Sequence, residues 1–232
     1  MPRRLRISTG GLAFHVLNRA VGRGRLFGGD ADYLAMLQVI EETQRRLPMR
    51  LAAFCLMPTH WHLVLWPRRD GELSEFMRLL TVTHTQRWHA QHHSAGTGPL
   101  YQGRFKSFPI QKDEHFLTVC RYVERNAVRA NFVRRAQRWR WCSAGQRAAA
   151  GSPAWLLEPG DWPVPAPEDW LPWVNRAQTA RELEALRTSA QRGRPFGNDR
   201  WQMQTARQLQ LQSTFRPRGR PPVRQKKDSR PL

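Results

Sequence analysis

The sequence predicts an α+β domain with the ferredoxin-like split βαβ arrangement, an antiparallel sheet with helices, followed by a helical, basic C-terminal extension. Two observations favour this fold class. Up to residue 126, apolar segments alternate in the order strand, helix, strand, strand, helix, strand, helix. Only a short turn at 57–59 separates the second and third strands, so these strands should pair as a hairpin. Hydrophobic residues make up 40% of the 232-residue chain, which is enough to bury a core.

The elements of this domain have recognisable boundaries. We expect strands at 12–17, 49–56, 60–66 and 104–110, long helices at 30–46, 72–92 and 113–126, and shorter helices at 176–191 and 199–210. Asp30 is expected to cap the first helix, in which Tyr33, Met36 and Ile40 recur at helical spacing. Pro109 near the end of the fourth strand indicates an edge position, because proline has no N–H to donate to a neighbouring strand.

Composition divides the chain into four parts. We expect the domain of alternating elements at 1–150, a Pro- and Trp-rich linker at 151–175, a small helical region at 176–214 and a basic tail at 215–232. The last part carries seven Lys or Arg residues against Asp228 alone, together with several prolines. Such a segment cannot bury apolar surface, and disorder is expected for it.

The chain is very basic, and its cations are mostly arginine. Lys and Arg exceed Asp and Glu by 38 − 18 = 20, and four of the 38 cations are lysine. Arginine makes planar, bidentate contacts with phosphate, whereas lysine acts as a point charge. An excess of this size indicates a polyanionic partner, of which nucleic acid is the commonest. The charge alone does not distinguish a binding protein from an enzyme.

Cysteine usage and hydropathy indicate the reducing cytoplasm, with association to the nucleoid through DNA. Cys55, Cys120 and Cys142 are widely spaced, form no CxxC pair and suggest no disulfide framework. No run of 18 apolar residues is present, so we expect no membrane partner. The sequence also lacks a phosphate-binding P-loop, so no nucleotide cofactor is expected.

His60-Trp61-His62, within the third predicted strand, is the most informative triplet. Residues i and i+2 of a strand point to the same face, so both imidazoles project together and Trp61 faces the packed side. Two neutral imidazoles can bind one divalent ion that keeps open positions for a substrate. Taken alone, however, such a pair is more often two ordinary histidines on a half-buried sheet face.

Tyr122 is one of only three tyrosines in the chain and lies near the end of the third predicted helix. Asn126 follows four residues later, which places its amide on the same helix face as the phenol. The pattern puts a potential nucleophile beside a potential oxygen ligand. A helical tyrosine that merely packs on the sheet is an equally good interpretation.

Three ordered segments resemble the HUH single-strand DNA transposases, and among them the REP-associated tyrosine transposases, relatives of the insertion-sequence transposases. Residues 57–65 (MPTHWHLVL) resemble the family signature MPNHxHLL. Residues 103–107 (GRFKS) and 122–130 (YVERNAVRA) are similar to its RFKS and YIxxNPVRA segments. The resemblance covers roughly residues 10–145. Thr59, Trp61 and Ala127 depart from the family pattern, but none of these departures removes a reactive atom.

This resemblance implies a metal-dependent single-stranded DNA endonuclease and strand transferase that acts on repetitive extragenic palindromic (REP) hairpins. His60 and His62, with Asn126 as third ligand, would hold Mg²⁺ or Mn²⁺. Tyr122 would attack the scissile phosphate and give a 5′-phosphotyrosine and a free 3′-OH. The simplest relatives act as dimers, whereas the C-terminal extension of this branch favours a monomer.

Several residues are expected to bind the DNA or to support the site. Phosphate contacts are expected from Arg19, Arg23, Arg25, Arg104, Lys106 and Arg129. Three aromatic residues, Trp88, Tyr101 and Trp139, could stack on unpaired bases. His15 and Glu124 could support the metal ligands, although a role in the core is the more ordinary interpretation of His15.

Two alternatives stay open at this point. The first is a non-catalytic DNA- or RNA-binding regulator, in which the helices around 193–197 (GRPFG) form a degenerate helix-turn-helix. The joint presence of the two histidines, Tyr122 and Asn126 argues against it, because a pure binding protein needs no such set. The second is a zinc hydrolase with a water nucleophile, for which a carboxylate base near the histidines is missing.

Overall fold

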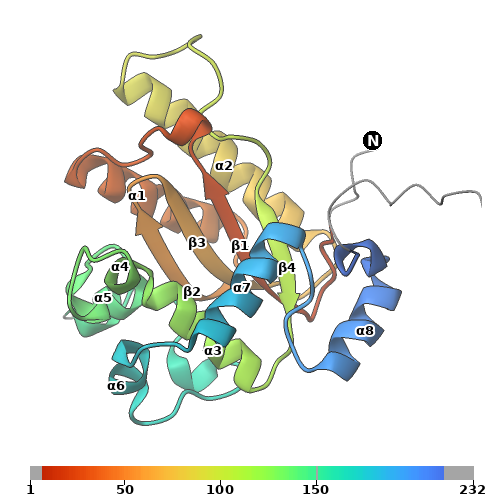
Figure 1. Ribbon diagram of the computed structural model, residues 1–232. Helices are drawn as coiled ribbons and strands as arrows, with labels where there is room; N and C mark the ends of the chain where they lie inside the picture. The colour runs from red at the N-terminus through yellow and green to blue at the C-terminus, as the bar shows by residue number, and fades with distance from the viewer. Residues whose placement is uncertain (1–6, 150, 217–232) are drawn as a thin grey trace, which may run out of the picture.

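Four antiparallel strands form one sheet in the order β2-β3-β1-β4 (Figure 1). The strands are β1 Ala13–Arg19, β2 Arg50–Met57, β3 His60–Trp66 and β4 Lys106–Ile110. β2 and β3 pair directly across their two-residue turn, as the short link predicts. With the helices between them, these strands give the split βαβ order, so the predicted fold class is confirmed.

The structure is a computed structural model that describes residues 7–149 and 151–216. The tail expected at 215–232 therefore lies almost wholly outside the described residues. No helix in the described ranges has the length and apolar character that crossing a membrane requires.

Two long helices cover one face of the sheet, and a third helix covers the other (Figure 1). α1 (Asp30–Arg46) and α2 (Glu72–Gln91) pack with the strands into one apolar cluster, which includes the fully buried Trp61. α3 (Glu114–Glu124) packs on the opposite face and helps to form a second cluster. Trp61 and the flanking histidines thus face opposite sides of β3, as the alternation of a strand predicts.

The expected cap of α1 is wrong. Asp30 is the first helical residue, and Gly29 occupies the N-cap position without a side-chain hydrogen bond. The carboxylate of Asp32 instead accepts a hydrogen bond from the Gly28 amide, at 2.7 Å. An acidic side chain three positions into the helix thus satisfies the backbone amide of the residue before the N-cap.

The third helix ends earlier than its apolar spacing predicts. α3 ends at Glu124, Arg125 leaves the regular helix, and a short helix α4 (Asn126–Arg129) follows. α4 ends in a Schellman arrangement. In it Asn131, at φ 60°, donates its amide to Val128 and the next amide donates to Ala127, both at 3.0 Å. Asn tolerates this left-handed conformation better than most residues.

The remainder of the described chain consists of short helices. They are α5 Ser143–Ala148, α6 Trp170–Asn175, α7 Ala180–Arg192 and α8 Asp199–Gln208, with 3₁₀ turns η1 Val21–Arg23, η2 Ala136–Arg138, η3 Pro159–Asp161 and η4 Gln212–Thr214. α7 begins with a complete capping box between Thr179 and Glu182 and crosses the α3 side of the sheet (Figure 1). Trp162 and Trp170, from the segment expected as a linker, pack edge to face with ring centroids 4.9 Å apart.

Later segments pair with both outer strands of the sheet. On β2, the Leu56 amide donates to Trp141, and the Leu157 amide donates to Leu51, each at 2.9 Å. On β4, the Phe196 amide donates to Pro109 and the Gln111 amide donates to Phe196, also at 2.9 Å. β4 is one of the two outer strands of the sheet, so the edge position predicted from Pro109 is confirmed.

Candidate active site

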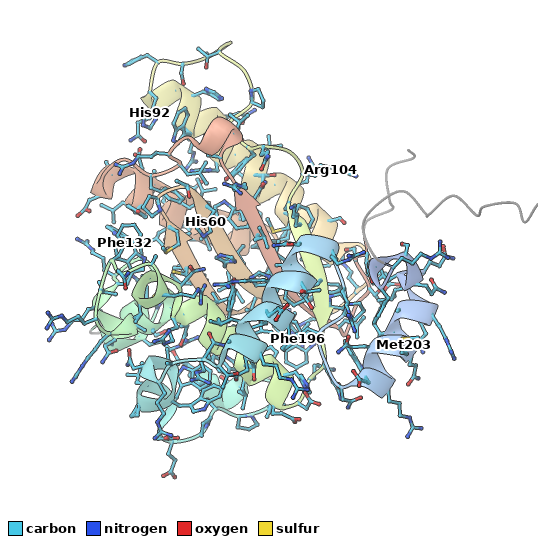
Figure 2. The ribbon with its side chains drawn as sticks, in the orientation of Figure 1. His60, His92, Arg104, Phe132, Phe196 and Met203 are labelled. Carbon is cyan, nitrogen blue, oxygen red and sulfur yellow. The ribbon has the colours of Figure 1, made fainter. Side chains whose placement is uncertain are left out.

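His60 and His62 project together from β3 toward the side of the sheet that α3 covers. Their ring centroids lie 5.0 Å apart with the planes nearly perpendicular. His62 is 6% exposed, whereas His60 stands at the start of the strand and is less buried. Figure 2 places His60 at the upper end of the sheet, where the β2–β3 turn brings it toward the surface.

A third histidine joins the pair from β1. The Nε2 atom of His15 lies 2.9 Å from Nδ1 of His62, and the two rings stack with centroids 5.0 Å apart. His15 is fully buried and also contacts Phe108 of β4. The core position and the supporting role, which the sequence poses as alternatives for His15, therefore occur together in one residue.

The hydrogen bonds of the two β3 histidines leave the same ring atom available on each. Nδ1 of His60 lies 3.1 Å from the Thr59 hydroxyl, and Nδ1 of His62 is bonded to His15. Within the described residues, no protein hydrogen bond engages Nε2 of either ring. An imidazole whose Nδ1–H is held by a partner is oriented to bind a metal ion through Nε2.

The surroundings keep all three histidines neutral near pH 7. Burial, followed by the charges of Arg19 and Arg129, lowers the pKa of His60 to about 4. Burial, and then Arg129, lowers the pKa of His15 to about 3. The pKa of His62 lies well below its usual value because of burial first and the neighbouring histidines next. The neutral imidazole is the form that binds metal ions.

The ring of Tyr122 packs against this cluster from α3. It meets His62 edge to face at 6.0 Å and His15 at 6.1 Å between centroids. The guanidinium carbon of Arg129 lies 4.1 Å from the centroid of the Tyr122 ring. An arginine and two histidines thus surround the one tyrosine that the sequence singles out as a nucleophile.

Asn126 lies beside the cluster at the start of α4. Its neighbour Ala127 belongs to the same buried cluster as Tyr122 and Cys55, and Cys55 stands directly opposite His62 in the β2–β3 pairing. Asn126 is 5% exposed, and its amide nitrogen is buried without a hydrogen-bond partner. This nitrogen can only donate, so it is free to hydrogen-bond an anionic oxygen. The Oδ1 atom is the one that can bind a metal ion, and no protein hydrogen bond of the described residues engages it.

The cations expected to bind DNA occupy different places around this cluster. Arg19 stands directly opposite His60 in the β1–β3 pairing and is exposed. Lys106 shares a cross-strand row with His62, because Leu17 pairs with both residues. Arg25 is exposed in the loop that packs on the β2–β3 turn through bonds from Leu26 and Phe27 to Pro58. Arg104 is exposed beside β4 (Figure 2), and the side chain of Arg23 lies outside the described part.

Two expected contributions are wrong. The Tyr101 hydroxyl is buried between Trp61 Nε1, at 3.1 Å, and His84 Nδ1, at 2.6 Å, so its ring cannot stack on a base. The carboxylate of Glu124 turns away from the histidines and toward the C-terminal helices. It accepts hydrogen bonds from Ser143, Arg147 and Trp170, at 2.6, 2.6 and 2.8 Å.

A separate group of potential metal ligands stands at the other end of α3. Asp113, Glu114 and His115 place one ligand atom each within 4.8 Å of one another. Asp113 caps α3 by accepting hydrogen bonds from the His115 backbone at 2.9 Å and from its ring at 2.8 Å. A helix cap is therefore sufficient to explain why these side chains lie together.

The bond between His15 and His62 could not be found in the sequence. A histidine in the first strand is visible, but only the pairing of β1 with β3 across 47 residues brings it to His62. The hydrogen bonds of Glu124 to Ser143, Arg147 and Trp170 and the buried position of Tyr101 likewise depend on tertiary packing.

Comparison with known proteins identifies a family whose sequence model matches this chain. The family model described as "Transposase IS200 like" matches residues 8–126, a range that includes the three histidines, Tyr122 and Asn126. No curated protein matches the chain.

Two solved structures match parts of the chain. A REP-associated tyrosine transposase bound to a REP hairpin is 21% identical, with a TM-score of 0.52, over 68% of this chain and 91% of that chain. A transposase candidate from Deinococcus radiodurans R1 is 16% identical, with a TM-score of 0.38, over 53% of this chain and 96% of that chain. The first likeness supports the fold described above.

Proposed function

Because the chain belongs to the IS200-like transposase family, we propose that it cleaves and rejoins single-stranded DNA through a covalent bond to Tyr122. The observation that carries the proposal is the packing of the Tyr122 ring against His62 and His15, with Arg129 over its face. This arrangement combines a nucleophile, a pair of neutral imidazoles and a fixed cation on one side of the sheet.

The residues present fit a divalent metal ion. His60 and His62 would bind it through Nε2, and Asn126 would supply its Oδ1 atom as a third ligand. Two imidazoles and an amide suit Mn²⁺ better than Mg²⁺, although either ion is compatible with the set. When bound, such an ion would polarise a phosphate oxygen and offset the charge that develops on it.

Tyr122 carries the covalent chemistry. Its phenol loses its proton, and the oxygen attacks the scissile phosphorus in line. One P–O bond forms to Tyr122 while the bond to the 3′ oxygen breaks, which leaves a 5′-phosphotyrosine and a protonated 3′-OH. Arg129 holds a positive charge beside the phosphate throughout. Attack by the 3′-OH of another strand reverses the step and joins DNA without ATP.

The substrate we propose is a hairpin of a repetitive extragenic palindrome with a single-stranded flank. The structurally similar transposase binds a REP hairpin, and the excess of positive charge in this chain, +20, suits any DNA. Arg19, Arg25 and Lys106 lie near the histidines and would contact phosphates there, with Arg104 further along the same strand edge. We propose that the chain acts as a monomer.

A denaturing gel tests the proposal. Labelled hairpin oligonucleotides from the host's REP sequences are incubated with the full chain in Mn²⁺ or in EDTA. The wild type should give a covalent protein–DNA band in Mn²⁺ only. Tyr122→Phe should lose the band while its DNA affinity stays nearly unchanged, because the substitution removes one hydroxyl.

Tyr33→Phe is the matched control. It also removes a single hydroxyl, from a tyrosine packed between Phe27 and Trp141 away from the histidines, and should leave the band intact. A normal band from Tyr122→Phe would mean that another group is the nucleophile. Tight binding with no band from the wild type on any hairpin would favour the non-catalytic regulator.

A further inference from the structure

Phe132 is the one aromatic residue among the strongly exposed large hydrophobic side chains of the described residues. It is 52% exposed and stacks on Trp139, with ring centroids 5.5 Å apart and planes 30° apart. We propose that the outer face of Phe132 is a stacking platform for an unpaired base next to the phosphate held at Tyr122. The proposal rests on the proposed function for the identity of that strand.

The rear of this platform is fixed to the sheet. The indole Nε1 of Trp139 donates to the Leu56 carbonyl of β2 at 2.9 Å. The other side of Trp139 meets the ring of Tyr33 of α1 edge to face at 6.0 Å. A ring that stacks on Phe132 would therefore meet a rigid support, which lowers the entropy cost of binding.

The position of Phe132 is set by the end of α4. In the Schellman arrangement, Asn131 is in the left-handed conformation and the Phe132 amide donates to Ala127 at 3.0 Å. The backbone of Phe132 is thus held three residues beyond the end of α4, a helix that begins at Asn126. Its apolar ring nevertheless remains at the surface instead of folding into the core.

Two chain connections place the platform beside the candidate active site. α4 links Phe132 to Asn126 and Arg129, which lie at the histidine cluster. On the other side, Trp139 is bonded to Leu56, next to Met57, which stands opposite His60 in the β2–β3 pairing. Figure 2 shows Phe132 and His60 toward the same end of the sheet.

The charge around Phe132 identifies the kind of partner. The sequence contains no Asp or Glu between Glu124 and Glu158 but contains seven arginines there. Arg134, Arg135 and Arg138 are exposed and form no ion pair within the described residues. An aromatic face among unpaired arginines suits single-stranded nucleic acid, whose bases stack while its phosphates bind cations. One exposed ring is far too small for a stable protein interface, which needs about 800 Å² on each partner.

The test measures binding and stacking without cleavage. The full chain carrying Tyr122→Phe is titrated with a single-stranded oligothymidylate of about 12 nucleotides that contains 2-aminopurine, whose fluorescence falls when it stacks. In this background Phe132→Ala should weaken binding about 5- to 100-fold and abolish the quenching. Phe132→Trp should retain both, and Phe132→Leu should bind weakly without quenching.

Met203→Ala is the matched control, because Met203 is 46% exposed on α8, away from Phe132 (Figure 2). It should bind and quench like the parent. Unchanged affinity and quenching in Phe132→Ala would overturn the proposal. A concentration-dependent dimer that is lost in Phe132→Ala would also overturn it, because the ring would then belong to an interface between two copies of the chain. The binding readout needs no covalent step, so this test is independent of the proposed function. If the wild type forms the Tyr122 adduct but Phe132→Ala binds DNA normally, the stacking platform is refuted and the proposed function stands.

Discussion

Single residues of the candidate active site are oriented by neighbours that no local pattern reveals. The sequence shows that His60 and His62 share a face, and the structure agrees because they alternate with the buried Trp61. The partner of each Nδ1 atom has a different origin. Thr59 is adjacent to His60 in the sequence, whereas His15 reaches His62 from another strand.

Replacing His15 should weaken metal binding while leaving the fold intact. His15→Phe fills the same space but offers no acceptor to Nδ1 of His62, so that ring loses its fixed tautomer and orientation. The affinity for Mn²⁺ should fall about 10- to 100-fold, as is typical when the supporting partner of a ligand is lost. Isothermal titration calorimetry with Mn²⁺ and no DNA measures it.

The control for this substitution is His89→Phe on α2, a histidine bonded to Ser94 and distant from the cluster. It should not change the affinity for Mn²⁺. Equal affinities for His15→Phe and the wild type would mean that His15 is a core residue only.

At the scale of elements, periodicity and turn length account for what could be predicted. Strand alternation and the short Pro58-Thr59 turn place the β2–β3 hairpin correctly, and helical spacing places α1 and α2. The end of α3 could not be predicted in this way, because its apolar face continues past the break. The break at Arg125 follows from tertiary contacts, as α4 turns to pack against η2 and β2.

Glu124, the last residue of α3, holds the following helices in place. Its side chain is fully buried and binds Arg147 of α5 and Trp170 of α6. Glu124→Gln should lower the free energy of unfolding by about 3 kcal/mol, because it leaves the Arg147 cation mostly buried without a counter-charge. Urea denaturation followed by circular dichroism measures the change.

An exposed ion pair provides the comparison for Glu124. Glu42→Gln breaks the pair of Glu42 with Arg87 on the surfaces of α1 and α2 and should change stability little. The double substitution Glu124→Gln with Arg147→Met should recover part of the loss, since no buried charge remains. A large loss for Glu42→Gln, or none for Glu124→Gln, would contradict this account.

α2 carries a buried histidine that makes stability depend on pH. Burial lowers the pKa of His84 to about 4, while its Nδ1 is bonded to the Tyr101 hydroxyl. Above pH of about 6.5 both folded and unfolded chains hold this ring neutral. Between about pH 6.5 and 4 this ring is protonated in the unfolded chain but neutral in the folded chain. The free energy of unfolding therefore falls, by up to about 1.4 kcal/mol for each unit that the pH decreases.

Comparison of the wild type with His84→Gln isolates this effect. The difference between their free energies of unfolding should be constant above neutral pH. As the pH falls toward 4, the wild type should lose stability relative to His84→Gln. Urea titrations at a series of pH values measure it. A difference that is independent of pH would show that His84 titrates normally in the folded chain.

The whole molecule combines a strong positive charge with a sheet whose two faces differ in what covers them. α1 and α2 close one face (Figure 1), and the histidines, Tyr122 and Arg129 lie on the other. Net charge and the order of elements predict a nucleic-acid-binding α+β protein from composition and periodicity alone. Which cations surround the site depends on strand register, and so could be known only from the fold.

Binding of single-stranded DNA should depend steeply on salt, and single cations should contribute separately. Arg25→Gln removes an exposed cation next to the β2–β3 turn and should reduce the slope of log affinity against log salt by about one. Arg87→Gln removes a cation already paired with Glu42 and should leave the slope unchanged. Fluorescence anisotropy at several salt concentrations distinguishes the two variants.

The segments that pair with β2 and β4 also have a consequence for solubility. Outer strands with unpaired backbone groups are templates on which a second chain can add a strand and begin aggregation. Here Trp141 and Leu157 occupy backbone groups of β2, and Phe196 occupies those of β4. A neighbouring copy would have to displace Phe196 before it could continue the sheet past β4. These three segments therefore protect the outer strands from pairing with the strands of another copy.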